Sequence, residues 1–204
     1  MTAKIKLNSA SGGGSFSLQA PSSSSNDRVI TLPDIADGTL LTSQSTGLGK
    51  VLQVIQTVKT DTTSHANGQT REDISGITVN ITPSATSSKI LISSSLNFCG
   101  IAGGYSFALY LMRDSTDLAI GDAAGTRARA TIGGLTDYDN GHDMRPWHYT
   151  YLDSPNTTSQ VTYKWQWNQP YHSQTMYLNR VYSDADNTYS ARGASNIIVQ
   201  EIAA

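Results

Sequence analysis

The chain of 204 residues has a single cysteine, Cys99, and no uninterrupted apolar stretch as long as 18 residues. One cysteine cannot form a disulfide within the chain. Because Cys99 lies in the apolar run LNFCGIAGG, we expect a small buried hydrophobic residue rather than a reactive thiol. A membrane-spanning helix needs about 18 or more apolar residues, so we expect no membrane insertion.

Charged residues are scarce as well. They make up 15% of the chain and leave a net charge of -2 at pH 7. Such a sequence has no basic field that would attract nucleic acid or anionic lipid. We therefore expect neither as a partner.

The motifs of common enzyme and metal sites are also missing. The sequence has no Gly-x-Ser-x-Gly turn, and residues 47–50 (GLGK) lack the upstream spacing and the Ser or Thr of a phosphate-binding loop. No two of His65, His142, His148 and His172 have the i, i+2 or i, i+4 spacing that places two imidazoles on one metal. We therefore predict a protein that is not an enzyme and needs no cofactor.

What the chain does have is a polar segment over residues 1–50. Its few larger residues come in sets spaced by two, which is typical of short strands: Ile5 and Leu7, Phe16 and Leu18, then Val29, Thr31 and Pro33. The glycines at 12–14 and the serines at 22–25 lose backbone entropy on ordering without burying apolar surface. No apolar run of signal-peptide length follows Met1. We predict an extended N-terminal arm of the mature protein, ordered by other subunits.

Residues 51–204 contain short apolar runs separated by Gly, Asp, Asn, Ser or Pro, the pattern of an all-β sandwich or barrel. The expected strands are 51–59, 76–82, 88–98, 105–113, 117–121, 127–133, 146–152, 160–168, 175–182 and 195–202. Residues 113–116 and 153–156 have the composition of hairpin turns. With no segment long enough for a helical crossover, we predict an antiparallel β-sandwich head over 51–204.

Two of these strands carry large side chains at every second position. Residues 161, 163, 165 and 167 (V, Y, W, W) share one face, and residues 105–112 (YSFALYLM) look apolar on both faces. In a chain of this size, the second apolar face suggests cover by another subunit. A symmetric homo-oligomer is the expected result.

Several segments together resemble the tail-fibre and related virion proteins of tailed phages, especially marine and cyanobacterial ones. They are IKLNSASG, SFSLQAP and DRVITLPDIADGTLLT in the arm, then GKVLQVIQTVKTDT, GITVNITPSATSSKILI, RDSTDLAIGDAAGTRARA, TYLDSPNTTSQVTYKWQW and NIIVQEIAA. The resemblance covers nearly the whole chain. It implies a virion protein exposed at the particle surface, in the tail, and a homotrimer with a jelly-roll or C1q-like head.

For such a protein, the expected function is host attachment. The arm, 1–50, would bind other tail or baseplate proteins, and the head would recognise a host-surface glycan or protein. Two alternatives stay open. One is a purely structural component (baseplate, neck or capsid decoration) without receptor contact. The other is an enzyme that degrades surface polysaccharide, with carboxylates such as Asp137, Asp143 and Asp153 brought together by folding.

Candidate receptor-binding residues lie in two segments rich in aromatic, amide and imidazole groups. Ring faces stack on sugars, and amides bind their hydroxyls. The segments are 144–149 and 168–174, and the candidates are Trp147, His148, Gln169, Tyr171 and His172. The second segment is the stronger, because Gln169 and Pro170 mark a turn from which Tyr171 and His172 should project.

A cation site is a further possibility at residues 137–143 (DYDNGHD). Asp137, Asp139 and Asp143 are separated by short gaps with a glycine between them, an arrangement that can direct several oxygens at Ca²⁺. The loop lacks the closing Glu and flanking helices of an EF-hand, and Asp, Asn and Gly are also ordinary turn residues. We therefore expect a solvated turn and no bound metal.

Overall fold

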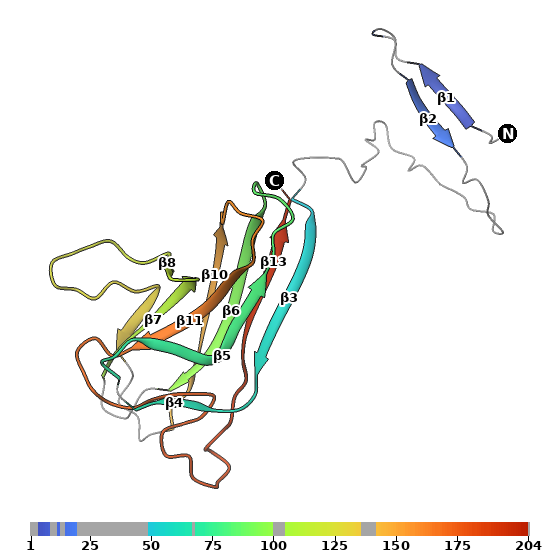
Figure 1. The fold of residues 1–204 in the computed structure, drawn as a ribbon. Helices are drawn as coiled ribbons and strands as arrows, with labels where there is room; N and C mark the ends of the chain where they lie inside the picture. Colours follow the sequence, from blue (N-terminus) through green and yellow to red (C-terminus); the bar gives the residue numbers. More distant parts are fainter. Residues whose placement is uncertain are drawn as a thin grey trace, which may run out of the picture. The chain divides into compact units, whose positions relative to one another are not determined.

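The computed structural model describes residues 4–8, 12, 15–19, 49–66, 68–99, 105–135 and 142–203. The chain divides into two units, Met1–Ser43 and Gln44–Ala204, each described by itself. In the first, β1 (Lys4–Asn8) pairs antiparallel with β2 (Ser15–Gln19) (Figure 1). The strands expected at residues 5–7 and 16–18 are thus confirmed. The third expected piece, with Val29, Thr31 and Pro33, lies outside the described residues.

The second unit, here called the head, is built from two antiparallel sheets (Figure 1). Sheet 1 has the order β3 (Val51–Lys59), β13 (Ser195–Ile202), β6 (Lys89–Cys99) and β10 (Arg145–Asp153). The short strand β12 (Met176–Leu178) pairs with the last residues of β6 on one side and with β4 (Thr63–His65) on the other. Sheet 2 has the order β5 (Glu72–Ile81), β11 (Val161–Asn168) and β7 (Ser106–Arg113), with β8 (Thr116–Leu118) and β9 (Ile132–Leu135) both paired to the other side of β7.

This arrangement confirms the prediction of an all-β, antiparallel, sandwich-like head. Every regular element in the described part of the chain is a strand. Consequently, no helix that could cross a membrane occurs among the described residues.

The core lies between the two sheets and follows the two-residue period of the strands. On β11, every second side chain from Val161 to Trp167 is buried, and the intervening ones are partly exposed. Tyr163, Trp165 and Trp167 on this strand are buried almost completely. Burying a large apolar side chain contributes about 1.5–3 kcal/mol before entropy is subtracted, so β11 contributes substantially to the stability of the core. Cys99 is buried as expected, and burial raises the pKa of its thiol to about 11.

Strand β7 is buried on both faces, as predicted, but its second face is covered by the same chain. Phe107, Leu109 and Leu111 face the core, whereas Ala108, Tyr110 and Met112 face outward. The outward group packs against Ala130 and lies under the guanidinium of Arg71. Cover by another subunit, which the second apolar face suggested, is therefore not needed to explain this burial, because a loop and an arginine of the head provide the cover.

The turn at 113–116 is confirmed as a hairpin between β7 and β8. The second turn, 153–156, is not a hairpin. It connects β10 in sheet 1 with β11 in sheet 2, and these two strands do not pair. At its start, Asp153 is buried and binds Arg113 and the hydroxyl of Tyr163 in the opposite sheet. The carboxylate therefore ties the two sheets together at the point where the chain crosses between them.

The registers of the strands define two ends of the head, here called near and far by their distance from the start of β3. At the near end, β3 begins beside the end of β13, where Val51 lies opposite Ile202 and Ala203 N donates to Lys50 O at 2.9 Å. At the far end, β11 ends at Asn168 opposite Ala108, close to the start of β7. Lys50, which precedes β3, lies at the near end, and the loops that follow β11 and β12 lie at the far end (Figure 1).

Candidate functional site

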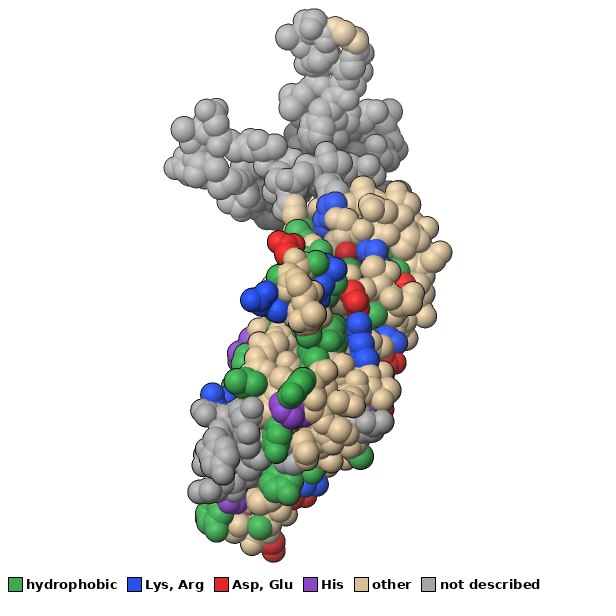
Figure 2. Space-filling view, turned by 90° about the vertical axis from the view of Figure 1, so that its left-hand side faces the viewer, with side chains coloured by type: hydrophobic (Ala, Val, Ile, Leu, Met, Phe, Trp, Pro, Cys, Tyr) green, Lys and Arg blue, Asp and Glu red, His purple; other side chains and the backbone are tan. Residues whose placement is uncertain are grey.

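A cavity of about 550 Å³ opens at the far end of sheet 2. Its walls come from three segments: the start of β7 with β9, the loop over residues 119–131, and the turn after β11. The lining residues are Ser106, Phe107, Ala108, Gly121, Asp122, Thr126, Ala128, Arg129, Ala130, Gly133, Gly134, Pro170 and Tyr171. This volume lies within the range of small-molecule and sugar sites. Figure 2 views the head from this side and shows a mostly uncharged surface on which hydrophobic and histidine side chains gather below the middle.

The loop over residues 119–131 is fixed at its neck. Gly121 N donates to Ala130 O at 3.2 Å, and Arg129 Nε donates to Gly121 O at 2.7 Å. The Thr131 hydroxyl donates to Leu118 O and accepts from Leu111 N, both at 2.9 Å. These bonds join the ends of the loop to β7 and β8, so the cavity has a defined wall.

Small residues make the space in the cavity. Gly133 and Gly134 on β9 lie against Phe107, and a Cβ on either would be 3.4–3.6 Å from its nearest Phe107 atom. Larger side chains at these positions would fill the cavity. The charged residues of the lining, Asp122 and Arg129, supply an acceptor and a donor on one wall, and Ser106 and Thr126 add hydroxyl groups. The site can therefore bind a ligand with several hydroxyl groups.

Tyr171 stands at the edge of this cavity with 79% of its surface exposed. Its ring meets that of His172 edge-on at 4.8 Å between centroids, and His172 meets Tyr105 in the same way at 4.6 Å. His172 Nδ1 also lies 3.4 Å from Ser106 Oγ. The sequence-based choice of Tyr171 and His172 thus falls on a supported aromatic group beside a cavity.

Gln169 has a different position from the one expected. It is fully buried, and its side-chain Oε1 accepts a hydrogen bond from Gln174 N at 2.8 Å. Its backbone N donates to Gly68 O at 2.5 Å, and a Cβ at Gly68 would collide with Gln174 O. As a correction, Gln169 does not present its amide to a ligand in solvent. It holds the turn that carries Tyr171.

Trp147 and His148 point to opposite faces of β10. Trp147 faces the core and packs against Phe107 at 5.1 Å between ring centroids, so it lies beneath the floor of the cavity. His148 is exposed on the outer face of sheet 1, opposite Ser95. The structure therefore does not bring His148 together with Tyr171, and it gives Trp147 a supporting position.

Of the acidic residues proposed for a cation or for catalysis, Asp137 and Asp139 lie outside the described residues. The other two, Asp143 and Asp153, are separated. The Asp143 carboxylate pairs with Arg145 Nε at 2.7 Å at the start of β10, and Asp153 ends that strand, about 30 Å away at about 3.3 Å per residue. No group of three or more metal-binding side chains occurs in the described ranges.

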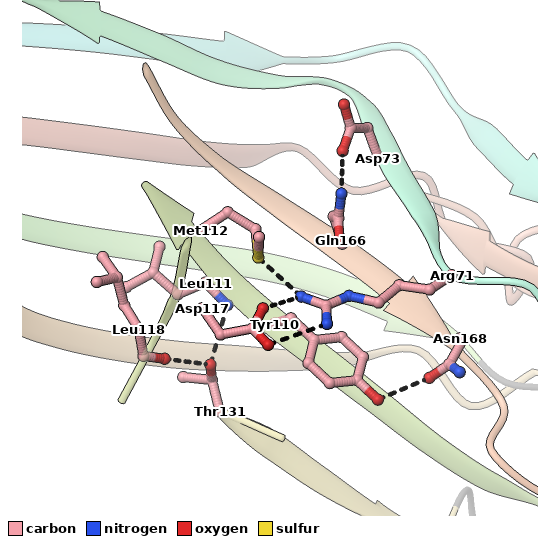
Figure 3. Close-up of polar contacts among 10 residues, drawn as sticks. All are labelled: Arg71, Asp73, Tyr110, Leu111, Met112, Asp117, Leu118, Thr131, Gln166 and Asn168. Atoms are coloured by element: carbon pink, nitrogen blue, oxygen red, sulfur yellow. Dashed lines mark hydrogen bonds and ion pairs between the residues drawn. The ribbon is translucent and has the colours of Figure 1, made fainter. Parts of the chain in front are cut away.

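A polar network that the sequence does not suggest covers the outer face of β7 (Figure 3). Arg71 forms an ion pair with Asp117, and its guanidinium carbon lies 3.8 Å from the ring centroid of Tyr110. Arg71 Nη2 also donates to Met112 Sδ at 2.7 Å, and the Tyr110 hydroxyl donates to Asn168 Oδ1 at 3.0 Å. Burial raises the pKa of Tyr110. Arg71 and Asp117 are far apart in the sequence, so no local pattern could have revealed this pair.

A hollow of about 350 Å³ borders this network. Lys164 pairs with Asp73 at 2.8 Å, and Gln166 Nε2 donates to the same carboxylate at 2.6 Å. Although burial raises the pKa of Asp73, these hydrogen bonds hold it below its ordinary value. The charges here are paired within the chain, so the cavity beside Tyr171 is the better candidate site.

No protein-family model matches the chain, and no curated protein matches it either. The activity of the protein is therefore inferred from its own surface. Fold alone assigns no function, because one sandwich architecture carries many activities.

Proposed function

We propose that this chain is a tail-fibre or related virion protein of a tailed phage, and that its head binds a host-surface glycan in the cavity beside Tyr171. In this proposal the head is a jelly-roll or C1q-like sandwich that forms a homotrimer. Residues 1–50 attach it to other tail or baseplate proteins. The proposal rests on the resemblance of the sequence to tail-fibre proteins together with one observation, the exposed ring of Tyr171 at the edge of a 550 Å³ cavity.

The chemistry of the cavity favours a sugar over a peptide or a charged ligand. A sugar presents apolar C–H faces, which stack on an aromatic ring, and hydroxyl groups, which pair with carboxylates, guanidinium groups and backbone amides. The cavity combines Tyr171 with Asp122 and Arg129 on walls of glycine and alanine. Because one acid and one base line it, no strong field of either sign selects a charged ligand.

The location of the cavity also fits attachment. The preceding segment enters the head at the near end, through Lys50 and Val51, whereas the cavity lies at the far end. A protein anchored by its arm would thus present Tyr171 away from the anchor.

The test is binding of labelled full-length protein to host cells and to their purified surface polysaccharide. The variants are Tyr171→Ala, the double variant Tyr171→Ala with His172→Ala, and Ala128→Trp, which fills the cavity and leaves the tyrosine in place. We expect loss of the Tyr171 ring to weaken binding about 2- to 12-fold, because a stacked ring contributes about 0.5–1.5 kcal/mol. Ala128→Trp should also weaken binding, because its indole would occupy the space of the ligand. Tyr189→Ala, a change to an exposed tyrosine that does not line the cavity, is the matched control and should bind normally.

Normal adsorption by the double variant would contradict recognition through this cavity. If the folded wild-type protein binds neither cells nor polysaccharide, the structural virion component becomes the better assignment. Release of reducing sugar from the polysaccharide would instead indicate an enzyme.

A further inference from the structure

The outer faces of the two sheets differ sharply in charge. On sheet 2, strands β5 and β11 present ion-paired and hydrogen-bonded side chains to solvent, such as Lys164 with Asp73 and the Thr162 hydroxyl with Asn80 at 2.8 Å. On sheet 1, the outward positions of β3, β13, β6 and β10 carry aliphatic, hydroxyl and amide groups, together with the imidazole of His148 on β10. The one charged side chain among these described positions is Lys89, at the near end, where it donates to Ser154 Oγ at 2.8 Å.

Aliphatic side chains are exposed across the outer face of sheet 1. On the edge strand β3, Val54 and Val58 are 58% and 53% exposed, and Leu52 is exposed beside them. On the opposite edge strand, Leu152 is 53% exposed and lies opposite Leu91 on β6. Ile198 on β13 continues the apolar surface between them. An uncharged sheet face with exposed aliphatic groups from edge to edge is typical of an interface and unusual for a solvated surface.

We propose that the outer face of sheet 1 is the surface by which copies of this chain associate, and that it forms the interior of the homotrimer. The number of copies in this inference rests on the proposed function. The face itself is identified by its own composition. A neutral surface suits a second copy, because identical faces meet without like-charge repulsion and no unpaired charge is buried between them.

The size of the face allows three copies to pack around one axis. Four strands spaced by about 4.8 Å and eight residues at about 3.3 Å each give a footprint of about 500 Å². Three such faces would bury about 1,500 Å² in total, or about 500 Å² for each pair of copies, so the trimer depends on all three contacts together. The near end of each head, where β3 begins, would then lie beside the near ends of its neighbours.

The test is the mass of the full-length protein by size-exclusion chromatography with light scattering at micromolar concentration. Wild-type protein should show three times 21.9 kDa. The variant Val54→Lys with Val58→Lys should fall to the mass of one chain, because both side chains are solvent-exposed within one head and only association would bury the lysines. The control, Thr78→Lys with Asn80→Lys, places two lysines at exposed positions of β5, the edge strand of sheet 2, and should keep the trimer mass.

Leu152→Lys, on the other edge of the same face, is a second variant in case the first does not fold, and circular dichroism confirms the β-structure of each. If the folded sheet 1 variants keep the trimer mass, the proposed interface is wrong, whereas the proposal of a trimer still stands. Loss of the trimer in the β5 control as well would also overturn it, because the effect would then come from added charge. A wild-type monomer would overturn both the interface and the trimer.

Discussion

Among single residues, Glu201 is the most tightly held carboxylate of the head. It is fully buried on β13 near the near end. Its oxygens accept hydrogen bonds from Gln53 Nε2 at 2.6 Å and from the Ser84 N and Oγ at 2.7 and 2.6 Å. Although burial raises the pKa of a carboxyl, these donors together with Ser88 lower the pKa of Glu201 to about 2. The ionised carboxylate therefore belongs to the folded state.

This residue predicts a loss of stability in acid. The pKa of Glu201 is lower in the folded chain than in the unfolded chain, where it is 4.5, so its contribution is fully present above about pH 5. The contribution is lost as the pH falls from there towards 2, and amounts to on the order of 3 kcal/mol. Urea unfolding of wild-type protein and Glu201→Gln at pH 7, 5, 4 and 3 would measure it.

The Glu201→Gln variant should be less stable than wild type at pH 7, and the difference should shrink as the pH falls. The control is Glu72→Gln, which changes a half-exposed carboxylate on β5. An equal difference at every pH would show that the ionisation of Glu201 does not couple to folding.

For single residues, the sequence could indicate which residue types recognise a ligand but not which of those residues face solvent. Tyr171 and His172 follow a Pro turn, and that local signal was sufficient to place them beside a cavity. Gln169 has the same kind of signal but is buried, because Gly68, a residue distant in sequence, binds its backbone. His148 and Trp147 are neighbours on one strand, so the strand period separates them. Of these outcomes, only the burial of Gln169 depends on a non-local contact.

Among the elements, β5 has the most informative irregularity. Its buried residues Ile74 and Ile77 are three positions apart, which breaks the two-residue period. Gly76 lies between them with φ +81, and the register to β11 shifts between Lys164 and Gln166. A bulge with glycine in the left-handed region keeps both isoleucines in the core.

Gly76→Ala should therefore lower the free energy of unfolding by about 1–3 kcal/mol, because alanine is strained at this φ. The added Cβ would also lie 3.1 Å from Lys59 Cδ, which must move. Denaturant unfolding measures the difference. The neighbouring exposed Ser75→Ala is the control and should change the stability by less than about 0.5 kcal/mol. Equal stabilities for the two variants would exclude a strained bulge.

The long strands could be predicted from sequence because their alternation is regular, as in β3, β6, β11 and β13. Where tertiary contacts replace alternation, prediction failed. The expected strand at 127–133 is mostly loop, and β9 covers only Ile132–Leu135. The strands expected at 117–121 and 175–182 end early, at Leu118 and Leu178, and the start of β5 before Gly76 was missed. β4 was also missed, since it has three residues and is held by pairing with β12.

For the molecule as a whole, the core that the described residues form lies between Ile74 and Val199, with Ile55 packed against it. The boundary between the arm, 1–50, and the head, 51–204, stays a prediction, and we expect the head to fold on this core without the arm.

A protein lacking residues 1–48 should therefore unfold at the same denaturant midpoint as the full chain, keep its oligomeric mass and bind the same polysaccharide. It should no longer attach to particles that lack the wild-type protein. Light scattering, the polysaccharide assay and co-sedimentation with such particles measure the three properties. Loss of polysaccharide binding on deletion would place recognition in the arm, contrary to the proposed function.

The two ends of the head also determine how it bears a mechanical load. A pull between the segment that enters at Val51 and a ligand held at the Tyr171 end acts along the length of β3, which is paired with β13 from Val51 to Lys59. The hydrogen bonds of this ladder run perpendicular to the strands. Such a force shears all of them together, whereas a force across the strands would break them one at a time. The head is thus oriented to resist tension along its long axis.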